Sequence, residues 1–264
     1  MLSFFILFHF VLFVFVRFLF YHDSGSERMM KMNEMIGSDF DGTLLKNGRI
    51  SQTVRDRIRN FRKNGNYFVI VTGRSVPKMK EGIKKYNVDF FDFIICSNGA
   101  ALLDHDLHVA EETPFAFDEI KKITELYKDK DLTLSSAEHS YFPDQRIGPE
   151  ERILAVSFES ETKAADRGDA YTVFQNGRYA DIVPAGVCKS AALLRLSKKM
   201  HVQSLYTIGD GENDLDLLDC TPYSFSFAHC PDTVKCHAGQ CCDTIEEVLD
   251  KILEKTTART DEGS

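Results

Sequence analysis

Two aspartates stand one residue apart at the end of a short apolar segment, within the sequence MIGSDFDGTLL of residues 35–45. If that segment is a strand, side-chain alternation places Asp39 and Asp41 on one side of it and Phe40 on the other. Two carboxylates held this close repel each other, and a divalent cation with oxygen ligands relieves the repulsion. The pair therefore indicates a Mg²⁺ site; the alternative is that Asp41 and Gly42 only form a turn after the strand.

Three further groups of polar residues accompany apolar segments. Thr72 and Arg74 flank a glycine after a β-branched run, and Lys189 precedes an expected helix. The sequence GDGEND adds Asp210 and Asp214 at the start of another helix. A hydroxyl, an ammonium group and distant aspartates around an acid pair are the groups that Mg²⁺-assisted phosphoryl transfer requires.

Each of these groups also has a purely structural interpretation. Thr72 can simply end a strand, and Lys189 can be a solvated residue at a helix start. The acids of residues 209–214 can cap the helix that follows them. For any one group the structural interpretation is the more common one, but four groups together at the ends of strands and helices favour a shared site.

The elements that must position these groups alternate between strand and helix patterns. Ser51 can cap a helix whose apolar residues Val54, Ile58 and Phe61 recur at helical spacing. Strands that alternate with helices predict an α/β fold with a parallel sheet and right-handed crossovers. Such a sheet binds ligands at the carboxyl ends of its strands. The expected strands cover residues 67–72, 91–96, 205–209 and 225–228, and the expected helices cover residues 77–86, 189–200, 213–219 and 245–255.

The pattern changes between residues 104 and 184. A helical segment at residues 117–128 is followed by segments of alternating polarity, and Asn176-Gly177 is a hairpin signal between two of them. This composition predicts a small α+β domain inserted into the parallel-sheet domain. The predicted domains are a leader at residues 1–28, a core at residues 29–103 and 185–264, and an inserted cap domain at residues 104–184.

Charge and cysteine content limit the functional classes. The net charge is −8 and the isoelectric point is near 5.5, which argues against nucleic acid as a partner. Four of the seven cysteines fall within residues 230–242, but their spacing lacks the C-x₂-C pairs of structural zinc sites. The same segment is compatible with a short helix that contains buried cysteines. An odd number of cysteines without clear pairing fits a reducing compartment, and we expect a cytoplasmic protein.

The first 21 residues (MLSFFILFHFVLFVFVRFLFY) are intensely apolar and long enough for a membrane span, although Arg17 interrupts them. A signal peptide would need a basic start and a cleavage site of small residues, which this segment lacks. Two interpretations remain. In the first, residues 1–21 form a single membrane anchor, which is the only means of membrane association that we expect. In the second, translation starts at one of the methionines between residues 29 and 35.

Five motifs together resemble those of a known superfamily. DFDGTLL, VTGRS, SNGA, the lysine at position 189 and GDGENDLDLL resemble the successive motifs of haloacid dehalogenase-like (HAD) hydrolases, in particular of the Cof-like type IIB branch. The resemblance covers about residues 35–255. It implies a Rossmann-like HAD core with an inserted C2B-type cap, a Mg²⁺ cofactor and an aspartyl-phosphate intermediate.

The resemblance also implies a role for each site residue. Asp39 would attack phosphorus, while Asp41 would protonate the leaving alcohol and then activate water. An aspartate at position 41 favours hydrolysis over an ion pump, because the pumps of this superfamily carry threonine there. Thr72, Lys189 and Asn213 would bind the phosphoryl oxygens. The metal ligands would be Asp39, the backbone carbonyl of Asp41, and Asp210, with Asp214 near the metal.

Two departures from the branch concern the cap and the motif lysine. The predicted insertion of about 80 residues is short for a domain that selects the substrate, and Ser190 stands where glycine is common. The leading hypothesis is a phosphatase acting on small phosphorylated metabolites such as sugar phosphates. A phosphomutase or phosphotransferase would use the same intermediate, and a non-catalytic binding protein could share the fold. The substrate and the oligomeric state stay open.

Overall fold

The computed structural model describes residues 33–142, 145, 147–160 and 170–262. The predicted leader at residues 1–28, with its two interpretations, lies outside the described residues. Among the residues that are described, no helix is long and apolar enough to cross a membrane.

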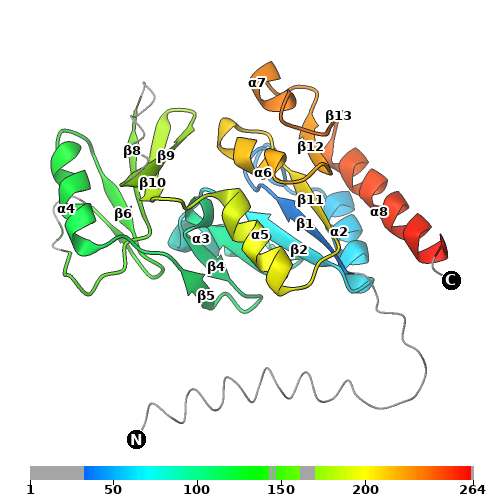
Figure 1. Cartoon of the computed structure of the whole chain (residues 1–264), viewed down its shortest axis with the longest axis horizontal. Helices are drawn as coiled ribbons and strands as arrows, with labels where there is room; N and C mark the ends of the chain where they lie inside the picture. Colours follow the sequence, from blue (N-terminus) through cyan, green and yellow to red (C-terminus); the bar gives the residue numbers. More distant parts are fainter. Residues whose placement is uncertain (1–32, 143–144, 146, 161–169, 263–264) are drawn as a thin grey trace, which may run out of the picture. The chain divides into compact units, whose positions relative to one another are not determined.

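An eight-stranded sheet forms the larger part of the fold (Figure 1). Its order is β13-β12-β11-β1-β2-β3-β4-β5, and neighbouring strands from β13 to β3 are parallel. β4 and β5 extend the sheet with antiparallel pairing. The strands are β1 (Glu34–Ser38), β2 (Tyr67–Val71), β3 (Phe93–Cys96), β4 (Ala101–Leu103), β5 (Val109–Glu112), β11 (Ser204–Ile208), β12 (Ser224–Phe227) and β13 (Gln240–Cys242).

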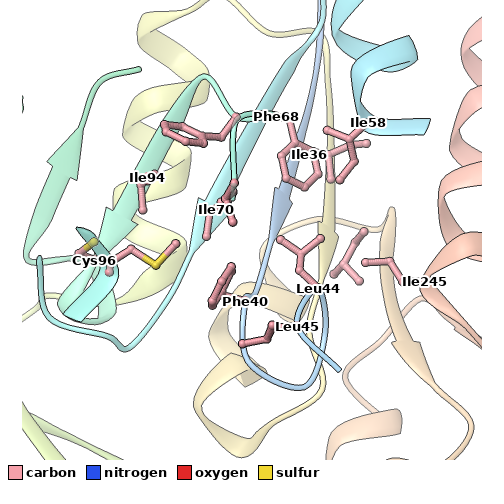
Figure 2. Packing of buried hydrophobic residues seen from close by; sticks show 14 of the residues in the cluster. Ile36, Phe40, Leu44, Leu45, Ile58, Phe68, Ile70, Ile94, Cys96 and Ile245 are labelled. Atoms are coloured by element: carbon pink, nitrogen blue, oxygen red, sulfur yellow. The ribbon is translucent and has the colours of Figure 1, made fainter. Parts of the chain in front are cut away.

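Helices pack on both faces of this sheet because its central strands are apolar on both faces. Ile36 of β1 belongs to a core cluster with residues of α2 and α8, and its neighbour Met35 belongs to another cluster with residues of α5 and α6. Figure 2 shows Ile36, Phe68 and Ile58 within the first cluster. The helices are α2 (Gln52–Lys63), α3 (Val76–Tyr86), α5 (Lys189–Lys199), α6 (Leu215–Asp219), α7 (Asp232–Lys235) and α8 (Ile245–Glu262).

The predicted helix cap and crossover pattern are confirmed. Ser51 precedes α2 and its hydroxyl accepts a hydrogen bond from the backbone N–H of Val54 at 3.1 Å. Strand, helix and parallel strand follow one another from β1 to β3, as the sequence pattern predicts. The chain therefore has the α/β core that its periodicity indicates.

A five-stranded antiparallel sheet makes up the second part, with the order β7-β6-β8-β10-β9. Helix α4 (Phe117–Leu126) packs on it through Ile120 and Ile123. Asn176 pairs with Tyr179, so the hairpin predicted at Asn176-Gly177 is confirmed. The strands are β6 (Thr133–Ser135), β7 (Ser140–Tyr141), β8 (Ala155–Glu159), β9 (Tyr171–Asn176) and β10 (Tyr179–Pro184).

The inserted α+β unit that the sequence indicates is thus present. Within the segment predicted as the insertion, β5 pairs in the larger sheet, whereas α4 and the strands from β6 to β10 form the second unit. The predicted domain boundaries themselves stay a prediction.

Candidate active site

Three of the polar groups singled out in the sequence lie at the carboxyl ends of three neighbouring strands of the larger sheet. Asp39 directly follows β1, Thr72 directly follows β2, and Asp210 lies two residues beyond β11. The order β11-β1-β2 makes these three strands adjacent. The backbone N–H of Asp39 donates to the carbonyl oxygen of Ile208 at 2.8 Å, which ties two of the strand ends together.

The loop after β1 is both a turn and part of the site. Gly42 has φ 89°, and a Cβ at this position would lie 2.1 Å from the Asp210 carboxylate, so only glycine fits. The Thr43 hydroxyl donates a short hydrogen bond to the same carboxylate. Phe40, which stands between Asp39 and Asp41 in the sequence, is fully buried and anchors the loop in the core (Figure 2).

Lys189 supplies a fully buried ammonium group at the start of α5. Its Nζ donates to Asp39 Oδ1 at 2.7 Å and to Asp214 Oδ1 at 2.5 Å. Burial alone would lower the pKa of Lys189, but the carboxylates of Asp214 and Asp39 outweigh it and raise that pKa. Lys189 therefore carries a positive charge beside Asp39.

Three carboxylates converge at this point. Oxygen atoms of Asp39, Asp210 and Asp214 all lie within 4.8 Å of one another. Burial, and next the charge of Asp214, raise the pKa of Asp39 well above its usual range. Burial also raises the pKa of Asp210. Three acids against one lysine leave excess negative charge, and an all-oxygen donor set of this kind suits a hard divalent cation.

Asp214 also orders the loop that carries Asp210. Its second oxygen accepts hydrogen bonds from the backbone N–H groups of Asp210, at 3.1 Å, and Gly211, at 3.0 Å. One carboxylate oxygen of Asp214 thus faces Lys189 and the other holds the backbone. This arrangement fixes the loop in the conformation that brings Asp210 to the cluster.

A cavity of about 280 Å³ opens beside the carboxylates. It brings together the predicted residues Asp39, Asp41, Thr72, Asn213, Asp210 and Asp214, and it also contains side chains from the antiparallel sheet. Lys189 is fully buried behind the cavity lining and contacts two of these residues, Asp39 and Asp214. Every residue that the sequence analysis assigned to the site is therefore found at one place.

Asp41 differs from Asp39 in its surroundings. The Asp39 side chain is buried, whereas the Asp41 side chain is 45% exposed and lies outside the group of three carboxylates. Arg74 binds it in a bidentate pair, with Nε at 2.7 Å and Nη2 at 2.6 Å from its oxygens. The guanidinium of Arg74 also lies 4.9 Å from the centre of the Phe40 ring. The sequence analysis did not foresee this pair.

The antiparallel sheet adds residues to the cavity that the sequence analysis did not assign. Ser157 of β8 and Asp181 of β10 both line it, as do Asn176 and Tyr179. The signal in the sequence is alternation in β10, where Ala180 and Ile182 are buried and Asp181 points to the opposite face. Alternation alone does not tell which face meets the site.

The cysteine cluster does not form a comparable group. Across the described residues, the Asp39–Asp210–Asp214 group is the one set of three potential ligands brought this close. Cys230 and Cys242 are buried, Cys236 and Cys241 are exposed, and α7 forms the short helix that the sequence allowed. The structure thus confirms the short helix but not a buried cysteine within it, because α7 contains no cysteine and Cys236 at its end is exposed.

Comparisons with known proteins agree with this geometry. The sequence profile of haloacid dehalogenase-like hydrolases matches residues 36–168 and 149–252. A 5-amino-6-(5-phospho-D-ribitylamino)uracil phosphatase of Bacillus subtilis (strain 168) is 24% identical over 239 residues, which cover 83% of this chain and 94% of that relative.

Solved structures share the fold. A phosphatase of the haloalkanoate (HAD) enzyme superfamily from Bacteroides thetaiotaomicron superposes with a TM-score of 0.70 at 20% identity, over 89% of this chain and 99% of that one. A haloacid dehalogenase-like hydrolase from B. subtilis superposes with a TM-score of 0.72 at 14% identity, over 81% and 96% of the two chains. Both superpositions cover the parallel sheet and the inserted antiparallel sheet together.

Proposed function

This chain belongs to the haloacid dehalogenase-like hydrolases of the Cof-like type, and on that premise we propose that it is a Mg²⁺-dependent phosphatase of small phosphorylated metabolites. The observation that carries the proposal is the placement of Asp39. Its carboxylate contacts the Lys189 ammonium on one side and adjoins the Asp210 and Asp214 carboxylates on the other, at the end of an open cavity. A nucleophile in that position has the Lys189 ammonium beside it, and a divalent cation held by the three carboxylates would add the further positive charge that offsets a phosphate.

Asp39 acts as the nucleophile and Asp41 as the acid and base. An oxygen of Asp39 forms a bond to phosphorus while the bond from phosphorus to the leaving alcohol breaks, and Asp41 gives that alcohol its proton. Water then attacks phosphorus, Asp41 takes the proton of the water, and phosphate leaves with the Asp39 carboxylate restored. Both acids line the same cavity, so one bound ester can reach them together.

The remaining residues bind and orient the phosphoryl group. The Thr72 hydroxyl, the Asn213 amide and the Lys189 ammonium are donors for its oxygens, and all three belong to or adjoin the cavity. Asp39, Asp210 and Asp214 would hold Mg²⁺, and the Asp41 backbone carbonyl would be a further ligand. The metal supplies charge neutralisation of the phosphate when it is bound.

The general experiment is phosphate release from a panel of phosphomonoesters by the 264-residue chain, with Mg²⁺ and with EDTA. We expect release that needs the metal and that varies among esters with the leaving alcohol. Phosphorylated products without free phosphate would favour a phosphomutase or phosphotransferase. Binding of esters without release of phosphate and without phosphorylated products would favour the non-catalytic alternative.

Asp210→Asn is expected to weaken Mg²⁺ binding at least about tenfold, because it removes one of three anionic ligands. Calorimetric titration with Mg²⁺ measures this without any substrate. Asp219→Asn is the matched control, since Asp219 lies on the nearby helix α6 and pairs with His237 instead. Equal Mg²⁺ affinity in wild type and Asp210→Asn would contradict the metal assignment.

Asp41→Asn is expected to separate the two chemical steps. With nitrophenyl phosphate as the substrate, the leaving nitrophenolate needs no proton. The variant should therefore release about one equivalent of nitrophenolate quickly and then turn over about 10²–10⁴-fold more slowly than wild type. An alkyl phosphate should show no such burst, because its alcohol must be protonated to leave. Stopped-flow absorbance measures the burst. If wild type turns over the ester and Asp41→Asn shows no burst, the proposed role of Asp41 is contradicted.

A further inference from the structure

The cavity has a second wall, which belongs to the antiparallel sheet and lies apart from the carboxylate cluster. Ser135, Ala155, Ser157, Asn176, Tyr179 and Asp181 form this wall. Most of these side chains are polar and uncharged, and Asp181 is the acid among them. In the reaction proposed above, the phosphoryl group occupies the end near Lys189, so this wall faces the leaving alcohol.

Asp181 is held in place by its neighbours in the sheet. Ala180 and Ile182 on either side of it are fully buried in the core of the inserted unit, which fixes the face that Asp181 presents. Asp181 of β10 is directly paired with Ser157 of β8, and the Ser157 hydroxyl donates to Asp181 Oδ1 at 2.6 Å. The carboxylate therefore has a defined orientation in the cavity wall.

Asn98 provides a second, independent observation beside Asp181. Its side chain is completely buried, and within the described part of the chain neither atom of its amide group has a hydrogen-bond partner within 3.5 Å, although the amide lies close enough to Asp181 to act on the pKa of that carboxyl. Ser97 and Asn98 both have φ near 51°, which non-glycine residues rarely adopt. Buried polar groups on strained backbone concentrate at functional sites, and Asn98 lies next to this one without lining the cavity itself.

Asn98 adjoins both Asp181 and the loop that follows β2, at Thr72 and Gly73. A Cβ added to Gly73 would lie 3.1 Å from Asn98 Oδ1, and the backbone N–H of Asn98 donates to the carbonyl oxygen of Thr72. Burial raises the pKa of Asp181, while Ser157, the Lys78 ammonium and the Asn98 amide act in the opposite direction. The exposed Lys78 also lines the cavity, where its charge acts on the Asp181 carboxyl.

We infer that Asp181 selects the alcohol part of the substrate: its carboxylate accepts hydrogen bonds from hydroxyl groups of the leaving group and repels a leaving group with a second anionic group. The substrate class is then a phosphomonoester of a polyhydroxylated, uncharged alcohol. Ser157 is a positioning residue for this carboxylate. The inference rests on the proposed phosphatase function and adds to it the residue that determines specificity.

The test compares three esters: glycerol phosphate, which has free hydroxyls, phosphoglycerate, which adds a carboxylate, and phenyl phosphate, which has neither. We expect Asp181→Asn to lower kcat/KM for glycerol phosphate by about tenfold or more, mainly through KM, because the neutral amide is a weaker acceptor. Phenyl phosphate should change by less than about twofold, and the preference for glycerol phosphate over phosphoglycerate should narrow. Asp118→Asn, on the exposed face of α4, is the matched control.

Two outcomes overturn the inference. One is an equal change for all three esters in Asp181→Asn, which would indicate a structural role. The other is no change for any of them. If wild type hydrolyses none of the esters, the phosphatase proposal fails, and calorimetric binding of glycerol phosphate to wild type and Asp181→Asn then judges the inference. Weaker binding to the variant supports it, and equal binding contradicts it.

Discussion

Asp39→Asn is expected to lower kcat for every phosphomonoester by at least about 10³-fold, because the amide cannot form the bond to phosphorus. The substitution keeps the size of the side chain, and Lys189 keeps its contact with Asp214 at 2.5 Å. We therefore expect a folded protein that has lost only the chemical step. Phosphate release under saturating ester and Mg²⁺ measures the loss.

The control for this prediction is Asp89→Asn, which makes the same chemical change in an exposed pair with Arg59. Its kcat should match that of wild type. Circular dichroism of both variants shows whether the fold is kept. An Asp39→Asn protein that is folded and retains more than about a tenth of wild-type kcat would mean that another group attacks phosphorus.

Lys189→Met is expected to remove activity and also to lower the free energy of unfolding by about 3–5 kcal/mol in EDTA. The Lys189 side chain is fully buried and is the direct counter-charge of two buried carboxylates, Asp39 and Asp214. Methionine fills the space but leaves both carboxylates without that partner. Urea unfolding in EDTA measures the loss, and Mg²⁺ should restore part of it.

The pH dependence of this variant follows from the same charges. Burial and the neighbouring acids already raise the pKa of Asp39 in wild type, and loss of Lys189 raises it further. At pH values between the ordinary and the raised pKa of Asp39, the folded variant then binds more protons than the unfolded chain, so its stability increases as the pH falls through the raised pKa. Lys199 lies on the same helix as Lys189 and forms a largely exposed pair with Glu111 of β5. Lys199→Met should therefore lower the free energy of unfolding by no more than about 1 kcal/mol. An equal effect of the two variants would contradict the account.

The convergence of the proposed site residues could be predicted from the sequence because each belongs to a short local signal. Asp39 follows an apolar strand, and Lys189 opens a helix with clear periodicity. Parallel strands place their carboxyl ends at one edge of the sheet, so knowing where strands end is enough to bring these residues together. Gly42 is predictable in part: its positive φ is a local requirement of the turn, whereas its close approach to Asp210 joins two distant segments.

Other features depend on contacts between distant segments, and no local signal predicts them. The pair between Asp41 and Arg74 requires knowledge of how two loops meet. The face of β10 that carries Asp181 is known only when the inserted sheet has its core and its neighbour β8. Antiparallel pairing of β5 with β4 is a further example, because short strands of mixed polarity gain their pairing from the sheet that they join.

The most direct test of the account is to look for the phosphoryl group on the protein during turnover. Full-length chain in molar excess is mixed with a radiolabelled phosphomonoester and Mg²⁺, quenched in acid after milliseconds, digested, and mapped by mass spectrometry. We predict a transient, hydroxylamine-sensitive phosphoryl group on the peptide that contains Asp39, which decays as free phosphate forms, and none on Asp39→Asn. Free phosphate that forms at the full rate without any labelled protein would contradict the central claim.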